Sequence, residues 1–435
     1  MKWNVKSKKV FILCLLVSLL IPSVAFCGGY SGFILGSKSQ AMGSAFVGLA
    51  DNPTAISINP AGIIQLDKTQ FLMGTTIADI HGHFVSSGEA GINKKDEESS
   101  LEQKYQFIPN LYITHKINDW VAIGFGEYTV YGASFIWEDK FEGRYVPTGK
   151  EGTIQTMTLA PVVAFKIVDG LSVGVGGRVE YLKTVFDNMN YIAPFLSEPN
   201  VKMTAKDWAL GWDIAALYKI NENFSTGIHY RSEINHYTDG DDVKFSPQIR
   251  MLQIRNTDAS FDFTFPQNVT LGFAWSQGPV TLTLDGTWWN WSHSNQELVV
   301  KFNDKVAFKS TQISPWDWND SWSVGIGGEY RLNALNRVIS LRAGYMWDQC
   351  PIPDSTVSPA SFQNDNHVFS IGTGFPIGPL YTDLFAAYVL TPDRDWDNSI
   401  GDARHPGKFS GNKRITGEFD DFNTFLFGID LSYKF

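Results

Sequence analysis

Cysteine is scarce in this chain of 435 residues, and the positions of its three cysteines exclude a scaffold stabilised by disulfides. Cys14 and Cys27 fall in an N-terminal region typical of an export signal, so Cys350 alone remains in the mature chain. A small secreted domain held together by disulfides needs paired cysteines. The fold must therefore be stabilised in another way.

Long apolar runs are missing as well, apart from one near the N-terminus. Four lysines precede the apolar stretch from Val10 to Ile21, and Ala25-Phe26-Cys27 has small residues at both ends of a cleavage triplet. The stretch is about half of the roughly 20 residues that a membrane-spanning helix needs. The sequence therefore predicts a cleaved signal peptide over residues 1–27 and no helical membrane anchor.

Basic residues are outnumbered, since 35 lysines and arginines face 45 aspartates and glutamates. The net charge of −10 becomes −14 when the four lysines of the signal are removed. Nucleic-acid binding requires clustered positive charge, so we expect no nucleic-acid partner. The sequence also has no G-x-S-x-G and no G-x-x-x-x-G-K motif. We expect no enzyme, no cofactor and no metal site.

Alternation of apolar and polar residues is the dominant pattern that is present. From Val280 to Trp288, for example, Val280, Leu282 and Leu284 alternate with threonines and an aspartate. Such alternation predicts strands with two chemically different faces. Aromatic residues make up 14% of the chain, and the 39 glycines are spread over its length, which favours one large β architecture.

The connections between the candidate strands alternate between tight turns and long loops. We count fourteen strands, centred near residues 74, 110, 125, 160, 178, 211, 229, 268, 286, 325, 343, 370, 385 and 428. The long loops cover about residues 81–103, 133–152, 186–203, 237–260, 293–316, 350–365 and 391–421. An even strand count with short turns at one end and long loops at the other predicts an all-β, antiparallel transmembrane barrel over residues 68–435.

Residues 28–67 do not fit the strand pattern. They are rich in small residues, contain scattered apolar ones, and include the turn-forming motifs Asp51-Asn52-Pro53 and Asn59-Pro60-Ala61-Gly62. A disordered leader and a plug folded inside the barrel are both compatible with this composition. The apolar content, with Phe46 among it, favours the plug.

The same segment resembles the N-terminal hatch of the FadL/TodX family of outer-membrane transporters. The likeness rests on Ala41-Met42-Gly43, Ala45-Phe46-Val47, Ala50-Asp51-Asn52-Pro53 and Asn59-Pro60-Ala61-Gly62. Further blocks agree along most of the mature chain, namely Phe141-Glu142-Gly143-Arg144-Tyr145, Phe265-Pro266-Gln267-Asn268 and Leu341-Arg342-Ala343-Gly344-Tyr345.

This resemblance implies a fourteen-stranded barrel, plugged by the hatch, in the outer membrane of a Gram-negative bacterium. Its expected partners are a hydrophobic small molecule, outer-membrane lipid and the barrel assembly machinery, with the chain as a monomer. The implied function is passive uptake of long-chain fatty acids, with lateral exit through the wall. Uptake of aromatic or alkane hydrocarbons is the alternative within this class, and a structural or surface-recognition barrel is the alternative from another class.

Candidate site residues fall into four groups. Two apolar loops predict ligand contacts, with Lys202 and Arg250 placed to meet a carboxylate. Glycines in the third strand predict a kink. Asn59 and Pro60 predict a turn that shapes the hatch, and the terminal Phe435 resembles an assembly signal. The residues are Phe195, Leu196, Lys202, Met203, Arg250, Met251 and Leu252 in the loops, Phe46, Asn59, Pro60 and Ala61 in the hatch, Gly124, Gly126 and Gly132 in the strand, and Phe435.

Overall fold

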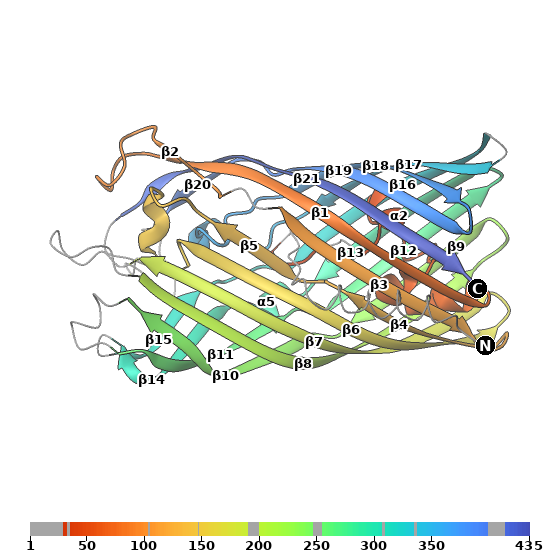
Figure 1. The fold of residues 1–435 in the computed structure, drawn as a ribbon, viewed down its shortest axis with the longest axis horizontal. Coiled ribbons are helices and arrows are strands. Elements are labelled where there is room, and N and C mark those ends of the chain that lie inside the picture. The colour runs from red at the N-terminus through yellow and green to blue at the C-terminus, as the bar shows by residue number, and fades with distance from the viewer. Residues whose placement is uncertain are drawn as a thin grey trace.

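The strands form one closed antiparallel sheet, seen from the side in Figure 1. This computed structural model describes residues 29–32, 35–102, 105–146, 148–189, 200–246, 255–306, 309–334, 337–398 and 414–435. Closure is made by β1 and β21, which pair from Gln70↔Lys434 to Ser86↔Gly417. Over the described ranges, none of the helices combines the length and apolarity needed to cross a bilayer.

The barrel wall has fourteen strands, several of which are interrupted and therefore carry two labels. We call β4 with β5 strand three, and β9 with β10 strand seven. In chain order the elements are β1 (Thr69–Ser86), β2 (Glu98–Ser100) with β3 (Gln106–Lys116), β4 (Val121–Tyr128) with β5 (Gly132–Ile136), β6 (Glu151–Val168), β7 (Leu171–Met189), β8 (Asn200–Lys219), β9 (Phe224–Arg231) with β10 (Ile234–Phe245), β11 (Thr257–Phe265) with β12 (Asn268–Gln277), β13 (Val280–Trp289) with β14 (Glu297–Val306), β15 (Lys309–Pro315) with β16 (Ser321–Ala334), β17 (Arg337–Asp348), β18 (Asn366–Ile377), β19 (Leu380–Leu390) with β20 (Arg394–Asp397), and β21 (Thr416–Lys434).

The fourteen predicted strand centres all fall within these strands. The short turns are confirmed too, with left-handed glycines at Gly170, Gly278 and Gly378, where a side chain would be strained. The predicted loop boundaries are wrong in several places. β7 continues to Met189 and β8 begins at Asn200, because strands rich in polar residues still pair their backbones beyond the apolar part of the wall.

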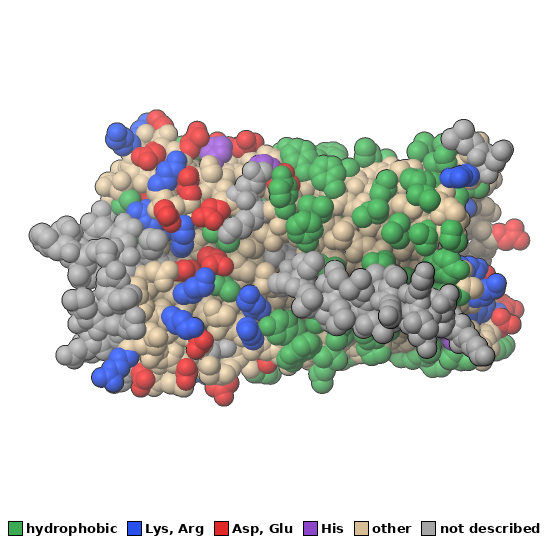
Figure 2. Space-filling view, in the orientation of Figure 1, with side chains coloured by type: hydrophobic (Ala, Val, Ile, Leu, Met, Phe, Trp, Pro, Cys, Tyr) green, Lys and Arg blue, Asp and Glu red, His purple; other side chains and the backbone are tan. Residues whose placement is uncertain are grey.

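Along the strands, apolar side chains point outward to lipid and polar side chains point into the barrel. On β13, the outward Leu284 is 46% exposed, whereas the inward Asp285 is only 5% exposed. Figure 2 shows hydrophobic side chains gathered over the part of the barrel nearer the short turns, while charged side chains gather toward the long loops. The wall therefore has an apolar belt, and a polar extension rises beyond it.

Three short helices lie between strand segments of the wall. They are η2 (Glu142–Tyr145), α5 (Trp291–Ser294) and η3 (Asp354–Thr356). Around η2, a cluster of aromatic rings buries Phe84, Trp137, Phe141 and Phe419 at centroid distances of 4.2–5.7 Å. These contacts tie several outer connections into one packed unit.

The stretch from residue 35 to 66, here called the N-terminal segment, lies inside the ring of strands. It contains α2 (Ser37–Ala41), α3 (Ala55–Ile58) and η1 (Pro60–Gln65). Asn59 caps η1 by accepting from the Ala61 N–H, and its Nδ2 donates to the carbonyls of Val47 and Ala216. The geometry is the turn expected from Asn59 and Pro60, because proline suits the first helical position.

Candidate functional site

Buried carboxylates of the wall hold the N-terminal segment. Asp285 on β13 accepts hydrogen bonds from the backbone N–H groups of Phe46 (2.7 Å) and Val47 (2.8 Å). Asp430 on β21 accepts from the N–H of Ser37 at 2.6 Å. Backbone donors inside a barrel need such acceptors because they have no ladder partner. Two carboxyl groups of the wall thus anchor the N-terminal segment.

Glycines of the wall let the segment's backbone come unusually close. A methyl group on Gly344 of β17 would overlap with the backbone nitrogen of Gly43. One on Gly227 of β9 would overlap with the carbonyl oxygen of Val47. These wall positions therefore require glycine, since only glycine leaves room for a second backbone.

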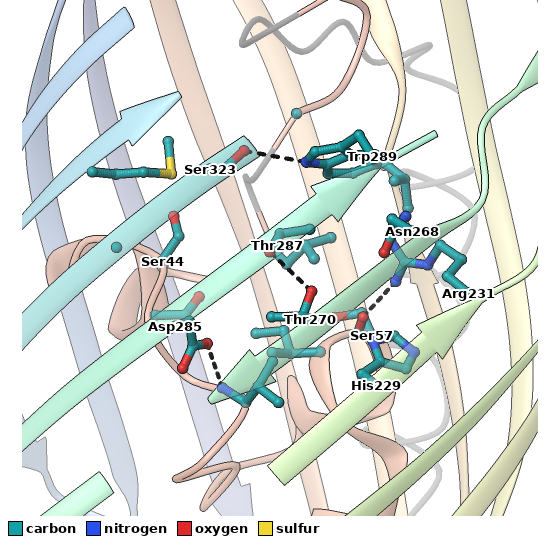
Figure 3. Close-up of a pocket in the computed structure, with 18 of the residues that line it drawn as sticks. Ser44, Ser57, His229, Arg231, Asn268, Thr270, Asp285, Thr287, Trp289 and Ser323 are labelled. Carbon is teal, nitrogen blue, oxygen red and sulfur yellow. Dashed lines mark hydrogen bonds between the residues drawn. The ribbon is translucent and has the colours of Figure 1, made fainter. Parts of the chain in front are cut away.

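A cavity of about 60 Å³ lies between the N-terminal segment and the wall strands β9, β12, β13 and β16 (Figure 3). This is room for several water molecules. Arg231 donates from Nη2 to the Ser57 carbonyl at 2.6 Å, and the Nδ2 of Asn268 has no hydrogen-bond partner among the described residues. The cavity is lined by polar groups on one side and by apolar ones on the other, namely Ser44, Ser57, His229, Arg231, Asn268, Thr270 and Asp285, and Leu35, Val47, Ile58, Val130, Trp289 and Met346.

Aromatic rings surround the start of the described chain just beyond this cavity. Tyr30 lies 4.9 Å from Trp318, 5.8 Å from Phe263 and 6.4 Å from Trp291 between ring centroids. Within the described part of the chain, the indole N–H groups of Trp291 and Trp318 have no acceptor. Large rigid rings with unused donors form a surface suited to hydrophobic or amphiphilic molecules.

The wall is incomplete between β3 and strand three. The two pair from Lys116↔Ala122 to Leu111↔Glu127, and ladder pairing then stops. The next residues of β3, 106–110, pair with β1 on their other side but, within the described residues, with nothing on strand three. Among the described residues, contact resumes with the hydrogen bond from the Glu102 N–H to the Ile136 carbonyl and the bridge Leu101↔Trp137. An unpaired sheet edge is exceptional in the wall of a membrane barrel, where backbone N–H and C=O groups must be hydrogen-bonded.

The N-terminal chain supplies part of the missing pairing. The N–H of Gly32 donates to the Val130 carbonyl at 2.6 Å, and the N–H of Gly132 donates to the Tyr30 carbonyl at 2.8 Å. These bonds fall at the break between β4 and β5. Strand three spans Tyr128 to Gly132 where β6 spans only Thr158 to Gln155, so one extra residue bends the strand.

Of the three glycines predicted to mark a kink, only Gly132 lies at the break. Gly124 and Gly126 lie in the regular part of β4, where they pair with β3 and β6 and face Ile56 of the N-terminal segment. The residues at the break itself, Val130 and Tyr131, were not predicted. A signal existed in Pro109 of β3, since a strand proline is confined to unpaired edges.

The predicted loop residues are only partly placed. Phe195, Leu196, Arg250, Met251 and Leu252 lie outside the described residues. Lys202, on the outer part of β8, donates to Glu151 at 2.8 Å and lies 3.9 Å from Asp187, while the neighbouring Met203 points inward and is buried. A carboxylate ligand at Lys202 would have to compete with Glu151, and its role in binding stays a prediction.

The remaining predicted residues lie in the N-terminal segment and at the end of β21. Phe46 is fully buried between the segment and the wall, and Ala61 packs against β7, with its carbonyl accepting from Ser172 at 3.0 Å. Phe435 follows β21, donates its N–H to the Thr69 carbonyl and is 42% exposed. Its part in assembly stays a prediction.

Comparisons with known proteins agree on one family. A family model described as outer membrane protein transport protein (OMPP1/FadL/TodX) matches residues 23–435. A long-chain fatty acid transport protein of Escherichia coli O6:H1 is 22% identical over 458 residues, covering 93% of this chain and 94% of that protein.

Two solved structures share the fold. The structure of a Pseudomonas aeruginosa FadL homologue superposes with a TM-score of 0.79 at 18% identity, covering 94% of this chain and all of that one. The Ralstonia pickettii toluene transporter TbuX superposes with a TM-score of 0.67 at 15% identity, covering 92% of this chain and 98% of the other.

Proposed function

The chain belongs to the OMPP1/FadL/TodX family of outer membrane transport proteins, and from this premise we propose that it takes up long-chain fatty acids by binding and passive diffusion. The family consists of transport channels of the Gram-negative outer membrane that carry fatty acids or hydrocarbons, and it contains no enzymes. The cargo of this chain is therefore hydrophobic, and the choice of fatty acid is our proposal.

The observation that carries the proposed route is the unpaired stretch of wall between β3 and strand three. Cargo enters from the outer loops, passes the aromatic rings around Tyr30, and leaves sideways into lipid through this stretch. The pairing of Gly32 with Val130 closes the stretch at rest. Two backbone hydrogen bonds, worth about 0.5–1.5 kcal/mol each, are few enough for bound cargo to displace.

The N-terminal segment acts in this proposal as a hatch that keeps water and solutes out. Its anchors, Asp285 and Asp430, support a hatch that stays in place while residues 29–32 move. We further propose that residues 1–27 direct export, that residues 28–67 form the hatch unit, that Phe435 serves barrel assembly, and that the protein works as a monomer.

Uptake of aromatic hydrocarbons is the second candidate, and the aromatic rings around Tyr30 favour it. Such cargo has no carboxylate and would not need Lys202 or Arg250. A barrel that serves only recognition at the cell surface would bind neither class.

The testing experiment is binding of a long-chain fatty acid to the refolded barrel, with residues 28–67 present and deleted. Saturable binding that weakens on deletion is the expected result, and Lys202→Ala and Arg250→Ala then report on the head group. Ile313→Ala, on the outer wall, is the matched control. Binding of toluene alone would transfer the proposal to hydrocarbons, and binding of neither ligand would refute transport of this kind.

A further inference from the structure

A second interruption of the wall lies between β8 and strand seven, here called the seam. Residues 200–246 are all described, and β8 pairs with β9 up to Asp213↔Arg231. Pairing returns only at Thr204↔Asp242, on β10. Between these points the strands have unequal lengths, so strand seven bows away from β8, and one backbone hydrogen bond, from Ser232 N–H to the Trp212 carbonyl, is present at its start.

Side chains of β7, which pairs with the other side of β8, cross the seam and contact strand seven. The lumen-facing residues of β8 here are small, Ala209 and Gly211, and they pair with Glu180 and Arg178 of β7. Their small size lets the two long side chains reach over β8. Arg178 donates from Nη2 to the Ser232 carbonyl at 2.6 Å.

His236 is the second contact across the seam. Its ring is fully buried, with Nε2 3.4 Å from Glu180 Oε1 and Nδ1 3.1 Å from Asp207 Oδ2. The ring therefore lies between two carboxyl groups, that of Glu180 on β7 and that of Asp207 on β8. Beyond Ser232, strand seven is thus held to β7 and β8 by side-chain contacts rather than by a backbone ladder.

The outer face of the seam is apolar. Trp208, Leu210 and Trp212 of β8 are exposed, and Leu210 is 75% exposed. In Figure 1, β8 and β10 lie along the lower edge of the barrel. A wall that faces lipid without backbone pairing is costly unless it lines a passage or is filled by other groups. Here the filling groups, Ile234 and His236, are attached to strand seven itself.

We propose that the seam is a second side opening between the lumen and lipid, closed at rest by Arg178 and His236, through which hydrophobic cargo also leaves. This rests on the proposed function, because a chain that carries no hydrophobic cargo has no use for a side opening. Outward movement of strand seven breaks one backbone hydrogen bond and a few side-chain contacts, whereas opening a fully paired part of the wall breaks a ladder. The strand remains paired with β11 on its other side.

Cross-linking tests the seam in the full-length protein. In a Cys350→Ser background, Ala209→Cys with Ile234→Cys is bridged by a thiol cross-linker that spans neighbouring strands. Fatty acid uptake is then compared before and after release by reductant. The matched control is Ala274→Cys with Thr283→Cys, a lumen-facing pair on the fully paired β12 and β13. Ile108→Cys with Val130→Cys locks the first opening in parallel.

A partial, reversible loss of uptake on locking the seam, with no loss in the control pair, supports the proposal. Unchanged uptake with the seam locked, together with full loss when the first opening is locked, overturns the second opening and leaves the proposed function standing. No fatty acid uptake in the unlocked parent overturns the proposed function and the second opening with it.

Hydrogen exchange of the unmodified barrel gives an independent measurement that needs no folding of a variant. Amides of residues 205–212 and 234–238 are expected to exchange faster than those of residues 270–276 on β12. Equal protection of the two stretches would contradict a seam that opens.

Discussion

Single carboxylates determine how firmly the N-terminal segment stays in the lumen. Asp285→Ala removes the acceptor for the N–H groups of Phe46 and Val47 and leaves both donors buried. The expected cost is roughly 1–3 kcal/mol. We expect larger and more frequent conductance steps in planar bilayers, because the segment loosens.

Thr283→Ala is the control for this change. Thr283 lies on the same strand and the same face, two residues away, and is equally buried. If both variants conduct alike, the anchoring role of Asp285 is wrong.

Glu142 in the outer aromatic unit gives the molecule a local pH dependence. Burial raises the pKa of Glu142 above its ordinary value of 4.5, despite a hydrogen bond from Ser86. Its protonation therefore favours the folded loop. The stabilisation is complete below pH 4.5 and is lost as pH rises through the raised pKa.

The variant Glu142→Gln should remove this dependence. We expect slower proteolysis of the loop around residues 141–146 than in the parent at pH 7, and equal rates near pH 4. Glu138→Gln, on the exposed side of the same loop, should show no such effect. Faster cleavage of Glu142→Gln at pH 7 would contradict a destabilising buried charge.

At the scale of elements, the strands were predictable and the interruptions were not. Alternation and turn residues located all fourteen strands, because the requirement for one lipid face and one lumen face is local to each strand. The break at Val130 depends on which residues pair across the wall, and pairing is not encoded in any single strand. Pro109 was the one local sign of it.

Small and apolar residues predict that the N-terminal segment folds inside the barrel, but they do not predict which wall residues it contacts. The wall surface that the segment contacts includes glycines on strands far apart in the sequence, such as Gly227 and Gly344. A single sequence gives no way to tell a glycine that admits a second backbone from one that merely faces lipid. Lys202 shows the same limit, since its partner Glu151 lies on another strand.

The close approach of Gly43 to Gly344 leads to a prediction for Gly344→Ala. Its added methyl group would overlap with the backbone of Gly43, and overpacking of this kind costs about 1–3 kcal/mol. We expect a lower midpoint of urea unfolding in micelles and easier release of the segment to protease.

Gly286→Ala on β13 is the matched control, because its methyl group would meet no atom within 4 Å. The close-approach argument is refuted if Gly286→Ala destabilises the barrel as much as Gly344→Ala does.

At the scale of the whole molecule, the apolar belt determines how the barrel sits in lipid. Outward residues such as Leu271, Leu284 and Ile326 are exposed in the isolated chain. In the membrane, the bilayer covers them. The polar extension beyond the belt rises into water and carries the packed aromatic unit (Figure 2). The proposed exit of cargo into lipid requires this arrangement, since an opening in the wall is useful only at the level of the belt.

Placing one charge at each level tests the membrane position. Leu284→Arg puts a guanidinium in the belt and should reduce the free energy of folding into lipid vesicles by about 2–4 kcal/mol, whereas Ile313→Arg, equally exposed on β15 in the extension, should cost about 0–1 kcal/mol. Folding yields into vesicles, read by heat-dependent electrophoretic mobility, measure both. Because the two residues differ mainly in level, equal losses would mean that the lipid reaches the extension, and the proposed openings would then lie deeper in the bilayer than the belt implies.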